Sequence, residues 1–118
     1  LPLTIFIAEI MFANNIADHD EDEENQRQTL VHYIGIESSK KVYVFWTIAA
    51  FIEIIIATSV GWLPITSYAM VILLPIVIKN ARAFIRRPVK QETFVLAIKN
   101  LVIVMCGMTI VILAGIWL

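Results

Sequence analysis

The sequence predicts an all-α membrane protein, built as a bundle of transmembrane helices. Its 118 residues are 59% hydrophobic and only 16% charged, and the mean hydropathy is +0.81. Soluble domains carry about 25% charged residues. The apolar residues form long blocks, whereas a soluble core would produce a shorter periodic pattern, and no stretch reads as a strand. The single cysteine, Cys106, lies inside an apolar block and excludes an intramolecular disulfide framework.

Four apolar segments are candidates for membrane spans, each of which needs about 20 residues to cross the hydrocarbon core. They are residues 1–13, 42–63, 65–78 (extending to 84) and 98–118. The first is too short to span by itself. Pro64 separates the second and third segments by a very tight connection, and Pro75 is expected to kink the third.

The charges predict which side of the membrane each connection faces. All nine lysines and arginines lie in or beside the linkers at residues 14–41 and 85–97. The turn at residues 61–64 falls on the other side, where Trp62 and Trp117 would lie at the interface. The positive-inside rule makes the basic side cytoplasmic. We therefore expect a multi-pass protein of the inner or plasma membrane, with its functional linkers in the cytoplasm.

The linker after the first segment carries the densest charge. Six of the seven residues from Asp18 to Glu24 are acidic. Asp18 and Asp22 are four residues apart, which places both carboxylates on one face of a helix, where like charges repel. Mg²⁺ bound to one or two carboxylates and to substrate phosphates would resolve the conflict. Asn14 lies one turn earlier on the same face, and Arg27 could contact a phosphate oxygen. A merely solvated acidic loop is the alternative.

The same stretch carries a family resemblance. The sequence NNIADHDEDEENQRQTL, from Asn14 to Leu30, resembles the second aspartate-rich motif of the UbiA superfamily of intramembrane prenyltransferases. The form N-N-x-x-D-x-x-x-D, followed by a basic residue, Thr-Leu and glycine, is similar to the branch that prenylates 1,4-dihydroxy-2-naphthoate in menaquinone biosynthesis. The matching positions are Asn14, Asn15, Asp18, Asp22, Thr29, Leu30 and Gly35. Arg27 stands where the family usually has lysine, and Gln26 where it usually has glycine.

The resemblance implies the C-terminal portion of a nine-helix UbiA-type fold, because three spans follow this motif. Residues 1–118 would be one portion of a single domain, inactive alone, since the family's first aspartate-rich motif is missing. It implies Mg²⁺ as cofactor, and a polyprenyl diphosphate, an aromatic acceptor and the lipid bilayer as partners, with no nucleic acid. An allylic carbocation attacked by the aromatic ring is the implied reaction. Asp18 and Asp22 are the implied metal ligands and catalytic residues, with Asn14 and Arg27 binding substrate.

Two other functions stay open. A different branch of the superfamily would use 4-hydroxybenzoate, homogentisate or haem as acceptor, against which the paired asparagines argue. A non-catalytic membrane protein fragment with an acidic cytoplasmic loop is the second. Arg82 and Arg86 share a helical face and could extend a phosphate-binding surface, although snorkelling to lipid headgroups is favoured. Glu9 and Glu53 lie within apolar segments, and the sequence assigns neither a role.

Overall fold

The computed structural model describes residues 2–19, 24–26, 29–87 and 93–118, and all regular structure in these ranges is helical. The elements are α1 (Pro2–Ala17), α3 (Leu30–Ile34), α4 (Ile36–Ser59), the 3₁₀ helix η1 (Ile65–Leu73), α5 (Leu74–Arg86) and α6 (Phe94–Trp117). The expected all-α membrane bundle is confirmed. Three stretches are long and apolar enough to span a membrane, at Ile36–Ser59, Ile65–Arg86 and Phe94–Trp117.

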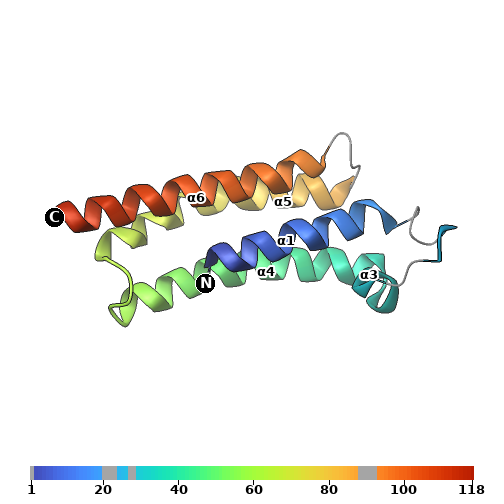
Figure 1. The fold of residues 1–118 in the computed structure, drawn as a ribbon, viewed down its shortest axis with the longest axis horizontal. Coiled ribbons are helices and arrows are strands. Elements are labelled where there is room, and N and C mark those ends of the chain that lie inside the picture. The colour runs from blue at the N-terminus through green and yellow to red at the C-terminus, as the bar shows by residue number, and fades with distance from the viewer. Residues whose placement is uncertain (1, 20–23, 27–28, 88–92) are drawn as a thin grey trace.

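The helices run side by side along an elongated bundle of 54 × 25 × 18 Å (Figure 1). α4 packs against α1, η1 and α5, while α6 packs against α1, η1 and α5. The ends of α1 and α5 and the beginnings of α4 and α6 lie together at one end of the bundle (Figure 1). We call this the acidic end, defined by Ala17, Ile36, Arg86 and Phe94. The predicted grouping of the two long linkers on one side is therefore confirmed.

The helix boundaries differ from those predicted by hydropathy. α4 begins at Ile36 and α6 at Phe94, before the predicted starts at residues 42 and 98. Hydropathy marks only the apolar part of a helix. α4 begins earlier, because polar residues such as Lys40 can form a helical turn at the membrane interface. α1 has 16 residues and is shorter than a span, as expected. The predicted tight connection at Pro64 is confirmed, with Gly61 at φ +84°.

The third span changes its helix type near Pro75. Residues 65–73 form a 3₁₀ helix, and the α-helix begins at Leu74 with the proline in its first turn. Proline has no amide hydrogen to donate, so the first turn of an α-helix is where it costs least. The proline expected to disturb this span thus lies at the junction between the two helix types.

Buried side chains form two clusters along the bundle axis. One includes Phe6, Phe51 and Met70, and Phe6 meets Phe51 edge to face at 6.1 Å between ring centroids. The second lies toward the acidic end and includes Ala13, Ile16, Tyr43 and Phe84. Small residues among them, such as Ala13, allow helix backbones to approach closely, as membrane helices require. This second cluster also includes Ala97 of α6, and it holds the end of α1 against α4 and α6.

Candidate functional site

The predicted motif begins on the last turn of α1. The Asn14 Nδ2 amide donates a hydrogen bond to Asp18 Oδ2 at 3.1 Å. The Asp18 backbone N–H in turn donates to the Asn14 carbonyl at 2.9 Å, so the helical bonding continues to Asp18. Both side chains are partly buried. The predicted placement of Asn14 and Asp18 on one helical face is therefore seen directly.

The packing of α1 explains why these two side chains are held in place. Ala13 and Ile16, which alternate with the motif residues along the helix, are buried at 0% and 2% exposure in the cluster at the acidic end. Phe12 contacts Trp46 of α4, with 5.6 Å between ring centroids. With one face of α1 packed against α4 and α6, the rotation of the helix is fixed. The direction in which Asp18 leaves the helix is consequently fixed as well.

The electrostatics of this helix end favour a bound cation. The carboxyl end of an α-helix carries a partial negative charge of about half an electron, so carboxylates there are disfavoured. Asp18 directly follows the last residue of α1, and the acidic residues 20–24 come next in the sequence. Carboxylate oxygens are the ligands that Mg²⁺ usually takes from proteins, and a neighbouring amide can hold them in a fixed orientation. The residues at this helix end therefore fit a hard divalent cation.

The rest of the predicted site is only partly described. Asp22 and Arg27 lie outside the described residues. Within the described ranges, no group of three His, Cys, Asp or Glu side chains converges into a metal-binding set. Asn14, for which the resemblance implies a role in substrate binding, donates its amide hydrogen to Asp18.

The described part of the linker contains one unusual backbone conformation. Gln26 has φ +57°, in the left-handed region. A side chain makes this region unfavourable by about 1–2 kcal/mol, whereas glycine adopts it readily. Gln26 occupies the position at which the resembling motif usually has glycine. A left-handed backbone conformation at this position is by itself a reason for glycine to be favoured there.

The linker leads into α4 through the short helix α3. Gly35 ends α3 at φ +86° and directly precedes α4. Its carbonyl accepts hydrogen bonds from the backbone N–H and the hydroxyl of Ser39, at 3.0 and 2.7 Å. Val31 of α3 is fully buried in the same cluster as Ala13. The glycine predicted as the end of the motif therefore sets the direction in which α4 begins.

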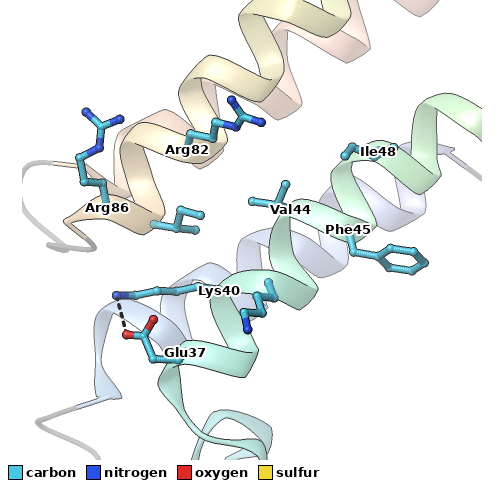
Figure 2. Close-up of a pocket in the computed structure, with 9 residues that line it drawn as sticks. Glu37, Lys40, Val44, Phe45, Ile48, Arg82 and Arg86 are labelled. Carbon is cyan, nitrogen blue, oxygen red and sulfur yellow. Dashed lines mark hydrogen bonds and ion pairs between the residues drawn. The ribbon is translucent and has the colours of Figure 1, made fainter.

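A groove of about 730 Å³ lies between the first turns of α4 and the last turns of α5 (Figure 2). We call it the basic groove. α4 contributes Glu37, Lys40, Lys41, Val44, Phe45 and Ile48. α5 contributes Arg82, Ile85 and Arg86. The sequence predicts that each of these cations lies near the end of a span. It does not predict that cations from two different spans line the same groove.

The two intramembrane glutamates have different surroundings. Glu9 is 2% exposed, and its Oε1 accepts a 2.8 Å hydrogen bond from the Thr47 hydroxyl of α4. Glu9 is therefore packed between helices, with a hydrogen-bond partner on α4. Glu53 is half-buried on α4.

A second polar connection holds α5 to α6 inside the bundle. Asn80 Nδ2 donates to Asn100 Oδ1, and Asn100 Nδ2 donates to the Val77 carbonyl, each at 3.0 Å. Asn100 is 1% exposed, so these bonds satisfy an amide that would otherwise be buried without partners. Like the pairing of Glu9 with Thr47, this contact is structural.

The comparison with known protein families agrees with the motif. A family model described as the UbiA prenyltransferase family matches residues 1–104. The matched range contains α1, the acidic linker, both helices that line the basic groove, and the first part of α6. No curated protein and no solved structure matches the chain at a significant level.

Proposed function

Because the chain belongs to the UbiA prenyltransferase family, we propose that it forms part of an enzyme that transfers a polyprenyl group from a polyprenyl diphosphate to an aromatic acceptor. We propose 1,4-dihydroxy-2-naphthoate as that acceptor, and menaquinone biosynthesis as the pathway. The paired asparagines before Asp18 support this branch. The bond from Asn14 to Asp18, at the membrane-facing start of the acidic linker, is the observation that carries the proposal.

Each predicted residue has a distinct role in this proposal. Asp18 and Asp22 would hold Mg²⁺, and the hydrogen bond from the Asn14 amide would fix the orientation of the Asp18 carboxylate for that role. Arg27 would donate hydrogen bonds to the diphosphate, for which a guanidinium is well suited. When bound, Mg²⁺ neutralises the diphosphate and stabilises it as a leaving group.

The helices would contribute by excluding water and accommodating the isoprenoid tail. Phe12, Ala13 and Ile16 are buried and form apolar packing around the first residues of the motif. An apolar groove of about 360 Å³ between α1 and α4 is lined by Ile5 and Trp46 among others. Such surfaces suit a hydrocarbon chain and would protect an allylic carbocation from hydrolysis. The aromatic ring of the acceptor would then be the nucleophile available to it.

We further propose that the acidic end faces the cytoplasm and that residues 1–118 are the C-terminal portion of one UbiA-type domain. The described lysines and arginines support the orientation, since they lie in the first two turns of α4 and α6, along α5 from Lys79 to Arg86, and at Arg87 directly after α5. Trp62 is 80% and Trp117 87% exposed at the opposite end, where aromatic belts are expected. Thiol labelling of Ser38→Cys in a Cys106→Ser background, from the cytoplasmic side only, would test the orientation.

The function is tested with the intact enzyme in a membrane. The enzyme is incubated with Mg²⁺, a polyprenyl diphosphate and each candidate acceptor, and the prenylated product is identified by mass spectrometry. We expect turnover with the naphthoate, and none for Asp18→Ala or Asp22→Ala despite normal insertion. Asn25→Ala, which changes an exposed polar residue of the same linker, is the control and should retain activity.

Turnover only with 4-hydroxybenzoate, homogentisate or a haem precursor would favour the other branch. Near-normal turnover in either aspartate variant would remove that residue from the site.

A non-catalytic role is the second candidate function. It would leave the acidic linker as a solvated loop, and neither aspartate variant would change any measured reaction. Absence of prenyl transfer from every acceptor by the intact protein would support it.

A further inference from the structure

The basic groove carries more positive charge than its own residues balance. Glu37 pairs with Lys40, with 3.4 Å between Oε1 and Nζ. Among the described residues, no carboxylate forms a salt bridge with Lys41, Arg82 or Arg86, and all three side chains are exposed. Arg82 and Arg86 are four residues apart on α5, a spacing at which like charges repel. The groove therefore presents three cations that an external anion would stabilise.

Below these cations the groove is apolar. Lys40, Val44 and Ile48 follow one another at intervals of four residues and form a single stripe along α4 (Figure 2). The stripe extends about 12 Å along the helix axis, from a charged side chain to branched aliphatic ones. Ile85 of α5 lies between Arg82 and Arg86 in the sequence and adds an apolar side chain from the second helix of the groove. Along α4 the polarity thus changes in one direction, from charged near the helix end to apolar toward the middle of the span.

This change of polarity has the same direction as that of a lipid monolayer. The cations lie in the first turns of α4 and the last turns of α5, close to the ends of the two candidate spans. Headgroup phosphates are found at this depth, with acyl chains extending inward. Basic pockets between membrane helices suit anionic headgroups.

We propose that the basic groove binds one anionic phospholipid. Its phosphate contacts Arg82, Arg86 and Lys41, and one acyl chain lies along Val44 and Ile48. The proposal is separate from the proposed prenyl transfer, because none of these residues belongs to the aspartate-rich site. A volume of about 730 Å³ lies within the range of small-molecule sites and accommodates a headgroup with part of a chain.

The test measures retained lipid on the intact protein. The protein is reconstituted in equal amounts of phosphatidylglycerol and phosphatidylcholine and extracted in mild detergent, and its bound lipids are counted by native mass spectrometry. We expect preferential retention of phosphatidylglycerol, reduced about tenfold in Arg82→Gln/Arg86→Gln. Lys79→Gln/Lys99→Gln removes the same charge from exposed positions outside the groove and should change retention less than twofold. If the double arginine variant fails to insert, Arg82→Gln and Arg86→Gln are measured singly, each with an expected reduction of about threefold.

Three results would overturn the proposal. Equal losses in the arginine and lysine variants would show only general attraction to a negative membrane surface. Unchanged phosphatidylglycerol retention with weaker binding of the polyprenyl diphosphate would assign the groove to the substrate. Displacement of the lipid by excess inorganic phosphate would show that the apolar stripe contributes nothing. Because the readout is bound lipid, failure of prenyl transfer would leave this result unaffected.

Discussion

Thr47 of α4 donates its hydroxyl to the buried carboxyl of Glu9 in α1, with 2.8 Å between the two oxygens. The two residues are 38 positions apart in the sequence, so the bond joins two helices that the long linker separates along the chain. A buried polar atom without a partner is costly, and membrane helices commonly pair such groups across interfaces. The bond therefore sets the register of α1 against α4, and with it the depth of Asn14 and Asp18.

Thr47→Val is predicted to destabilise the protein by about 1 kcal/mol, because the Glu9 carboxyl would lose its donor. Thr58→Val is a matched control on the same helix, since the buried Thr58 hydroxyl donates only to the Ile54 carbonyl of its own helix, at 2.7 Å. Unfolding in a denaturing detergent would measure both. Equal losses in the two variants would show that the bond between helices contributes nothing beyond a buried hydroxyl.

The contact of α6 with η1 predicts unequal effects of two glycine substitutions. A Cβ at Gly115 would meet the ring of Pro64, which cannot move away without its backbone. A Cβ at Gly107 would lie 2.6 Å from Leu73 Cδ1 and 2.9 Å from Met70 Sδ, both in flexible side chains. Alanine favours the helix by up to about 1 kcal/mol at either site. We expect Gly115→Ala to destabilise by about 1–3 kcal/mol and Gly107→Ala to be near neutral. A smaller loss at Gly115 than at Gly107 would contradict this reading.

Gln26→Gly is predicted to stabilise the protein by roughly 1 kcal/mol, since glycine removes the steric cost of a left-handed conformation. Gln26→Val should destabilise by at least a similar amount, because a β-branched residue tolerates φ +57° poorly. Thermal midpoints of the intact protein measured in one detergent would compare them. A lower midpoint for the glycine variant than for the wild type would refute the conformational explanation.

The order of the helices could be predicted from the sequence, because the signals that mark spans and turns lie in short stretches of neighbouring residues. Long apolar blocks identify spans, and Pro64 with Gly61 identifies the tight turn, because each signal lies within a few neighbouring residues. The starts of α4 and α6 were placed too late, since hydropathy marks the hydrocarbon core and helices extend past it. The spacing of Asn14 and Asp18 likewise predicted a shared face that the structure describes.

Contacts between helices could not be predicted from such local signals. The spacing of Arg82 and Arg86 indicated a shared face of one helix, but nothing local relates them to Lys40 and Lys41. Similarly, Glu9 stood out as a costly intramembrane acid, yet its partner Thr47 is an ordinary residue in another apolar block. Such pairings depend on the rotation and offset of packed helices, which are set by side-chain packing along their whole length.

The hydrogen bond from Asn14 to Asp18 predicts a specific defect in cation use. Asn14→Leu removes the amide that orients Asp18 Oδ2, and loss of such an orienting partner typically weakens metal affinity by about 10–100-fold. The Mg²⁺ concentration for half-maximal prenyl transfer should rise by that factor, while the thermal midpoint without Mg²⁺ stays unchanged. Asn14→Asp should also be impaired, because an ionised carboxylate cannot donate a hydrogen bond to Asp18 Oδ2. Calorimetric titration of the intact enzyme with Mg²⁺ and a polyprenyl diphosphate gives a readout independent of turnover. An unchanged Mg²⁺ requirement in Asn14→Leu would show that the amide has no orienting role. An equal rise in the Mg²⁺ requirement of Asn25→Ala would show that the effect is not specific to the pair of Asn14 and Asp18.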